Sequence, residues 1–106
     1  MTIIAEQFLD LAYSDEKVAV RLLAPRQQDE STWICRFEIS APIDVALDIQ
    51  GTSSLQALAL SLKSLSATLY STELYRSGQL GAWGEFNGHL GIPAPGIFAD
   101  IAPETF

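Results

Sequence analysis

The sequence predicts an α+β domain in which one long helix packs on a four-stranded antiparallel sheet. Between residues 55 and 69, leucines recur at alternating steps of three and four, which is typical of one face of an amphipathic helix. Between residues 3 and 50, four shorter segments alternate apolar and polar side chains, as strands with one buried face do. The chain has 106 residues, of which 48% are hydrophobic, so we expect one domain spanning residues 1–106.

The helix is expected to begin near Ser53 and to end before Gly78. Ser53 and Gln56 have the spacing of a capping box, in which each side chain binds a backbone N–H group at the start of the helix. Glycine is the residue type that most readily adopts the left-handed conformation that ends a helix. Four residues of the leucine stripe are expected to cover the sheet: Leu58, Leu62, Leu65 and Leu69.

The first two strands are expected to form a hairpin that turns at the polar residues 14–17. This four-residue loop places Tyr13 opposite Val18 and keeps the apolar side chains of both strands on one face. The same register places Asp10 opposite Arg21 on the other face, where the opposite charges attract.

The next two strands are expected at residues 32–39 and 43–50, after Pro25 and a polar loop at residues 26–31. The remaining chain is an irregular segment rich in glycine and proline, and a short strand at residues 82–86 would make the sheet five-stranded. Its four aromatic residues are too many for a disordered tail, so we expect them to order it. They are Trp83, Phe86, Phe98 and Phe106.

The formal net charge is −7, and the six basic residues are scattered along the chain. Because nucleic-acid binding depends on clustered lysine and arginine, we expect no nucleic-acid partner. A basic protein is the electrostatically easier partner, although acidity for solubility alone explains the same charge. The sequence contains no apolar run of the ~18 residues that a membrane span needs, so we expect no membrane partner. It also shows no basic signal-peptide region and has a single cysteine, so we expect a cytoplasmic location.

The sequence predicts no catalytic, metal or cofactor site. No motif connects His89, the only histidine, to a nucleophile or an acid, so we interpret it as a surface or capping residue. Cys35 alternates in phase with apolar neighbours, which indicates a small buried residue. Asp44 and Asp48 share one face of a strand about 13 Å apart, which is wider than the carboxylate pair of a glycosidase.

Three short motifs resemble a group of small uncharacterised bacterial proteins. They are Ser54-Leu55-Gln56-Ala57-Leu58, Trp83-Gly84-Glu85 and Leu90-Gly91-Ile92-Pro93. The resemblance implies two β-hairpins followed by a helix, a bacterial origin and no known activity, and it assigns no functional residue.

The sequence supports three hypotheses about function. The first is a small acidic, non-catalytic protein-binding module, in the manner of the immunity or antitoxin-like inhibitors that bacteria pair with toxins. The second is a small-molecule-binding protein or enzyme, with a pocket between the sheet and the C-terminal segment and His89 at its rim. The third is a homodimer in which the sheet or the helix packs on itself.

For protein binding, the partner is expected to be a second copy of the chain or a basic bacterial protein. The predicted register places Phe8 opposite Leu23 on the face turned away from the helix, where both are exposed unless the C-terminal segment covers them. The residues expected to bind are Phe8, Leu23, Asp44, Asp48, Trp83 and Phe86.

Overall fold

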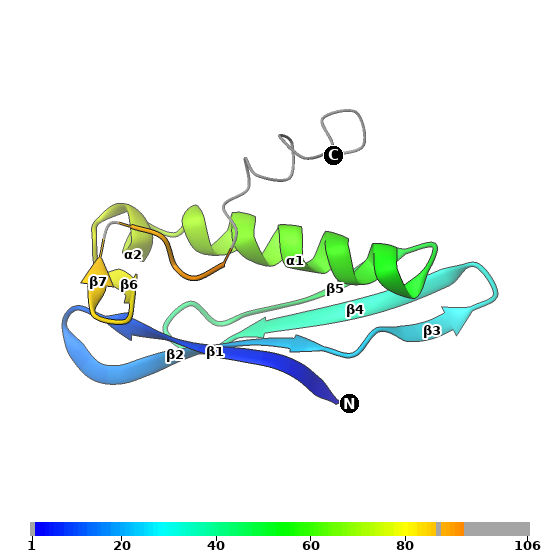
Figure 1. Cartoon of the computed structure of the whole chain (residues 1–106), viewed down its shortest axis with the longest axis horizontal. Helices are drawn as coiled ribbons and strands as arrows, with labels where there is room; N and C mark the ends of the chain where they lie inside the picture. Colours follow the sequence, from blue (N-terminus) through cyan, green and yellow to red (C-terminus); the bar gives the residue numbers. More distant parts are fainter. Residues whose placement is uncertain (1, 87, 93–106) are drawn as a thin grey trace.

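The computed structural model describes residues 2–86 and 88–92, which form a sheet with helices on one side only (Figure 1). The α+β class is confirmed, but these residues contain seven strands rather than four or five, and two helices rather than one. The predicted roles of Phe98 and Phe106 lie outside the described residues. The elements are β1 (Ile3–Leu11), β2 (Ser14–Leu23), β3 (Arg26–Asp29), β4 (Thr32–Ile39), β5 (Val45–Gly51), α1 (Ser54–Tyr70), α2 (Glu73–Arg76), β6 (Leu80–Ala82) and β7 (Glu85–Phe86).

The strands β1, β2, β4 and β5 form an antiparallel meander, and β6 and β7 extend the sheet beyond β1. β3 pairs with the same edge of β4 as β2 does, because β5 occupies the other edge of β4. Residues 26–31 were predicted to be a loop, yet they contain β3. Pro25 interrupts pairing because it has no N–H group, but the polar residues after it resume an extended course along β4.

The register of the first hairpin differs from the predicted one by four residues. Leu9, and not Tyr13, lies opposite Val18. The chain turns at residues 12 and 13, and the polar residues 14–17 belong to β2 instead of the turn. Because four is an even number, the shift keeps the apolar side chains of both strands on the inner face, which is the face that α1 covers.

α1 begins at the predicted cap. The Ser53 hydroxyl accepts a hydrogen bond from the N–H group of Gln56 at 3.0 Å. The Gln56 side chain reaches back one residue further than a standard capping box, because Oε1 accepts from the N–H group of Thr52 at 2.6 Å. Both side chains therefore satisfy backbone donors at the start of the helix.

α1 faces the sheet along a line that is displaced from the leucine stripe. Leu65 and Leu69 are buried, whereas Leu55 is 73% exposed. Ala57 and Ser61 are fully buried on the same face, and their small side chains let the helix pack closely on β4 and β5. The other two leucines of the stripe are half-buried against the same core, namely Leu58 and Leu62.

The helix ends at Tyr70 instead of continuing to Arg76. The Thr72 hydroxyl donates to the carbonyl of Leu69 at 2.8 Å and accepts from the N–H group of Tyr75 at 3.1 Å. Its side chain thus ends one helix and begins the next, since threonine hydroxyls compete with backbone hydrogen bonding. Gly78 follows α2 with a φ of 77°, the left-handed conformation that the sequence predicts there.

Residues 88–92 pack on the inner face of the sheet. Leu90 and Ile92 are buried, and the Tyr70 hydroxyl binds both by accepting from Leu90 N at 3.0 Å and donating to Ile92 O at 2.8 Å. The Gln7 side chain donates to Leu90 O at 2.6 Å. This described part of the C-terminal segment therefore lies on the same side of the sheet as the helices, away from Phe8.

We expect Leu65→Ala to lower the free energy of unfolding by about 2–5 kcal/mol, because it leaves a cavity between α1 and the sheet. Leu55→Ala, at the exposed start of the same helix, is the matched control and should change the free energy by less than about 0.5 kcal/mol. Urea unfolding followed by circular dichroism measures both. Equal effects of the two substitutions would show that the buried line of α1 is assigned incorrectly.

Candidate functional site

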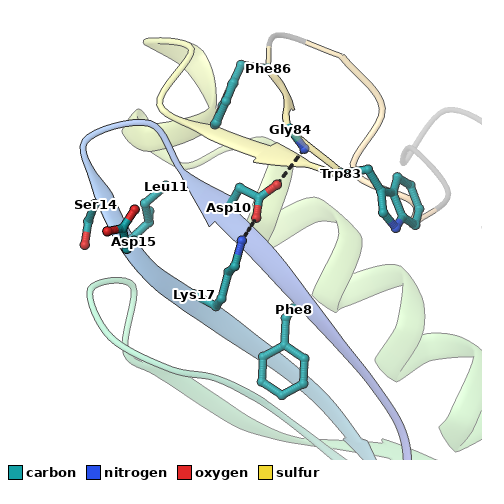
Figure 2. A pocket seen from close by; sticks show the side chains of 9 residues that line it. All are labelled: Phe8, Asp10, Leu11, Ser14, Asp15, Lys17, Trp83, Gly84 and Phe86. Atoms are coloured by element: carbon teal, nitrogen blue, oxygen red, sulfur yellow. Dashed lines mark hydrogen bonds and ion pairs between the residues drawn. The ribbon is translucent and has the colours of Figure 1, made fainter.

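A hollow of about 550 Å³ lies where β1, β2 and the β6–β7 hairpin meet (Figure 2). Three aromatic residues that the sequence singles out stand around it, and the Asp10 carboxylate lies between them. We call it the aromatic hollow. Its lining consists of Phe8, Asp10, Leu11, Ser14, Asp15, Lys17, Trp83, Gly84 and Phe86.

Trp83 and Gly84 form the two-residue turn between β6 and β7. Both have a positive φ, 52° and 78°, as the central residues of a type I′ turn do. Asparagine followed by glycine is preferred in this turn, since the β-carbon of most other residues is strained in the left-handed region by about 1 kcal/mol or more. Trp83 adopts this conformation although its side chain is 78% exposed, so burial of the ring does not offset the strain.

Two glycines make room for the aromatic rings. A β-carbon added at Gly91 would lie 2.5 Å from Cη2 of Trp83, so the indole ring packs directly on the glycine backbone. A β-carbon added at Gly81, which pairs with Phe86, would lie 2.6 Å from Cδ1 of that ring. Both rings are therefore positioned before any partner binds, which reduces the entropy lost on association.

Asp10 connects the hairpin to the first two strands. Its Oδ1 binds Nζ of Lys17, and its Oδ2 accepts from the N–H group of Gly84 at 2.7 Å (Figure 2). The cross-strand partner is thus Lys17 rather than the predicted Arg21. The pKa of Asp10 is lowered below its ordinary value of 3.8, because hydrogen bonds favour the ionised carboxylate. The hydrogen bond with Lys17 has the largest effect, and the hydrogen bond with Gly84 has the second largest.

A second hollow of about 480 Å³ adjoins the first along the β1–β2 turn. We call it the turn hollow, and its lining consists of Leu11, Ala12, Tyr13, Ser14, Asp15 and Phe86. Tyr13 is 59% exposed in the turn. Asp15 and Glu16 have no counterparts on β1 and form a bulge in β2. Among the described residues, no hydrogen bond or ion pair engages the Asp15 side chain.

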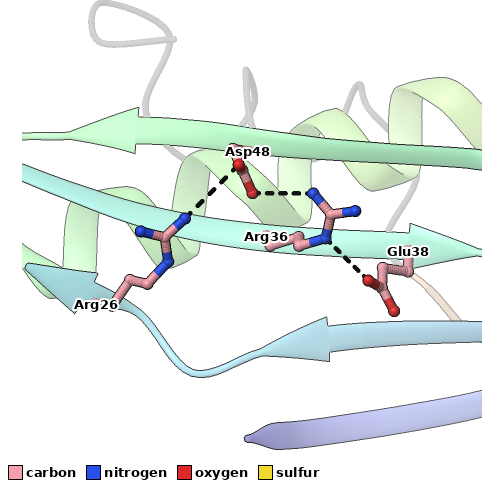
Figure 3. Close-up of polar contacts among 4 residues, drawn as sticks. All are labelled: Arg26, Arg36, Glu38 and Asp48. Atoms are coloured by element: carbon pink, nitrogen blue, oxygen red, sulfur yellow. Dashed lines mark hydrogen bonds and ion pairs between the residues drawn. The ribbon is translucent and has the colours of Figure 1, made fainter. Parts of the chain in front are cut away.

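Four of the six basic residues lie on the outer face of the sheet, where each pairs with a carboxylate. Asp48 binds Arg36 at 3.3 Å and lies 3.7 Å from Arg26 (Figure 3). Glu38 binds Arg36 at 2.9 Å. The carboxylates of Glu38 and Asp48 both raise the pKa of Arg36, and Glu38 has the larger effect. Asp48, a predicted binding residue, is therefore engaged within the protein. The other outer pairs are Glu6–Arg21 and Asp10–Lys17.

Leu23 and Asp44 also lie apart from the aromatic hollow. Leu23 is only 4% exposed and lies opposite Ile3 instead of Phe8, so it presents no binding surface in this structure. Asp44 is exposed in the connection before β5, on the far side of β4 and β2 from β1. Of the six predicted binding residues, the fold brings three together, and it adds others that sequence reasoning missed. The structure brings together Phe8, Trp83 and Phe86, and adds Asp10, Tyr13 and Asp15.

The residues with reactive side chains are separated from one another. His89 is exposed, and its Nδ1 accepts from the N–H group of Gly91 at 3.0 Å. Cys35 is fully buried, and burial raises the pKa of its thiol. The nearby Ser61 hydroxyl offsets part of this increase, although the two groups form no hydrogen bond of ordinary geometry. Within residues 2–86 and 88–92, no three His, Cys, Asp or Glu side chains cluster as metal ligands, and no helix is long and apolar enough to cross a membrane.

A smaller, mainly apolar cavity of about 190 Å³ lies between the inner face of the sheet, α1 and residues 91–92. His89 does not line it, in contrast to the predicted pocket with this residue at its rim. The cavity is smaller than the ~300–1,000 Å³ of typical ligand sites. Its lining consists of Ala5, Glu6, Gln7, Val20, Leu22, Leu62, Leu65, Gly91 and Ile92.

These features define a class of small α+β protein, with a sheet that helices cover on one face and that carries an aromatic hollow at the edge where β1 meets the β6–β7 hairpin. The chain belongs to a family described as a domain of unknown function (DUF6968), whose model matches residues 5–94 and so includes both hollows. No curated protein and no solved structure matches the chain. The family agrees with the resemblance to uncharacterised proteins and leaves the activity open.

We expect Trp83→Asn to be more stable than Trp83→Ala by about 1 kcal/mol, because asparagine tolerates the left-handed conformation better than alanine does. Both substitutions remove the indole ring, so the difference between them reports the backbone alone. Chemical denaturation of the two variants measures it. Equal stabilities would mean that the turn does not impose strain on residue 83.

We expect Asp10→Asn to destabilise the protein at neutral pH and to have little effect in strong acid. The folded-state pKa of Asp10 is lowered, so its contribution is fully present above the ordinary value of 3.8 and disappears as the pH falls through the lower folded-state pKa. Unfolding free energies between pH 2 and 7 test this. Glu30→Gln removes an exposed carboxylate in the β3–β4 turn and serves as the control. A pH-independent effect of Asp10→Asn would contradict the assignment.

Proposed function

We propose that this protein is a non-catalytic protein-binding module that holds its partner at the aromatic hollow. The observation that carries the proposal is Trp83, a large apolar side chain that is 78% exposed in a strained turn. Strained residues concentrate at functional sites, and tryptophan is among the residues most enriched at binding hot spots. Phe8, which is 54% exposed on the neighbouring strand, enlarges the same apolar surface.

The openness of the site favours a macromolecule over a small ligand. The aromatic hollow is bounded by side chains that project from a sheet and a hairpin, and Figure 2 shows these side chains set well apart from one another. Small-molecule sites enclose most of the ligand surface, whereas protein interfaces use exposed aromatic anchors of this kind.

The charge distribution favours a basic partner over a second copy of the chain. On the outer face, each of the four basic side chains already has an acidic partner, so much of the net charge of −7 comes from acids elsewhere. Two copies repel each other at this charge, whereas a basic protein is attracted and oriented.

Within this function, we assign the protein to the immunity or antitoxin-like inhibitors, with a basic bacterial protein as its partner in the cytoplasm. Small size, acidity and a preformed surface suit an inhibitor that covers a basic target. A second candidate is binding of an apolar ligand in the cavity beside α1, and its volume of about 190 Å³ restricts this candidate to ligands smaller than those of typical sites.

We expect peptides selected from a random display library on the wild-type protein to lose affinity by about 30-fold or more on Trp83→Asn, the effect of removing a hot spot worth ~2 kcal/mol. Fluorescence anisotropy with labelled peptides measures this loss. Because asparagine suits the turn, a folding defect does not explain it, and circular dichroism verifies the fold.

Leu55→Ala is the matched control, since it removes another exposed apolar side chain away from the hollow. It should leave the affinity unchanged. Selected peptides that bind Trp83→Asn as tightly as wild type would overturn the proposal. Light scattering that shows dimers of the free protein, dissociated by Trp83→Asn, would replace the foreign partner with a second copy.

A further inference from the structure

We infer that the turn hollow is a separate subsite that binds an arginine side chain of the partner. This inference rests on the proposed function, because the partner is the protein held at the aromatic hollow. The two hollows share Leu11, Ser14, Asp15 and Phe86 in their linings, so a single extended segment can occupy both.

The lining of the turn hollow combines one carboxylate with two aromatic rings. Asp15 supplies the negative charge, and its side chain has no hydrogen bond or ion pair among the described residues. Tyr13 is 59% exposed on one side, and Phe86 is half-buried on the other, where it packs on Gly81. These groups place an unpaired, exposed carboxylate in the same hollow as an exposed tyrosine and a half-buried phenylalanine.

Among the residues that the structure describes, no cationic side chain lines this subsite. The nearest basic residue in sequence, Lys17, lines the aromatic hollow but not the turn hollow, and its ammonium group binds Asp10. Glu16, beside Asp15 in the bulge, and Glu85, before Phe86, are exposed and add negative potential. An anionic side chain would therefore be repelled here, whereas a cation is attracted.

The chemistry of the lining favours arginine over lysine. A guanidinium group is planar, stacks on aromatic rings and can bind a carboxylate with two parallel hydrogen bonds. An ammonium group is more strongly hydrated and does not offer the same flat surface. An exposed ring contact and an exposed ion pair each contribute modestly, which suits a subsite that assists the aromatic anchor.

The experiment compares acetyl-arginine amide with acetyl-citrulline amide, which has nearly the same shape and no charge. Titration into ¹⁵N-labelled protein, followed by NMR, locates binding through the amide signals of residues 13–16 and 86. We expect shifts there that grow with the arginine concentration, and binding about fivefold or more weaker with citrulline. Asp15→Asn should remove the preference for arginine, whereas Glu30→Gln, an equal charge change in the distant β3–β4 turn, should leave it unchanged.

Equal binding of the two probes, or shifts confined to other parts of the protein, would overturn the arginine subsite. An unchanged preference for arginine in Asp15→Asn would overturn it as well. The outcome is separable from that of the proposed function. Display-selected peptides that depend on Trp83 but not on Asp15 would refute the arginine subsite alone, and peptides that are insensitive to Trp83→Asn would refute the protein-binding role.

Discussion

The surface at the end of the sheet depends on one carboxylate. Asp10 binds Lys17 on the neighbouring strand and the N–H group of Gly84, which lies 74 residues further along the chain. This contact holds the β6–β7 hairpin against β1, although the two elements share only the Asp10–Gly81 and Leu11–Leu80 backbone pairs. The hairpin carries Trp83 and Phe86 and is also held by the buried side chains of Leu80 and Ala82, so the ionised Asp10 carboxylate acts together with the core in positioning it. The site is therefore built on a hydrogen-bonded charge, and the apolar side chains are placed around it.

The uneven covering of the sheet explains why that surface is available. α1 covers β4 and β5, and Leu90 and Ile92 extend the cover over the inner face beside them. The described residues place no helix on the outer face (Figure 1), where alternating acidic and basic side chains satisfy one another. Such exposed pairs contribute little to stability, but they keep most of the face polar. Phe8 is an exposed apolar residue on this face, and Trp83 is exposed at the edge of the sheet, where its ring packs on Gly91.

Stability and binding make opposite demands on the Trp83–Gly84 turn. A residue that suits the left-handed conformation would stabilise the hairpin, whereas tryptophan there supplies a large contact surface at the expense of backbone energy. Gly91 also accommodates the indole ring, because it has a φ of 80° and no side chain at the place where the ring packs. The backbone at Gly91 thus leaves room for an exposed ring, and a ring held in this way is what the proposed binding role requires.

The sequence by itself determined the fold class, the capped start of α1 and the presence of four principal strands, because these depend on local periodicity and capping. It also singled out Phe8, Trp83 and Phe86, since aromatic residues in a polar strand face or in a glycine-rich segment are conspicuous. Only the tertiary structure decided that they meet. The hairpin register depends on a bulge that periodicity does not reveal, and β3 has no apolar pattern to reveal it. Asp10 acquires its role from a hydrogen bond with Gly84, 74 residues further along the chain, and Tyr13 and Asp15 share a hollow with the distant Phe86, which the order of the residues does not reveal.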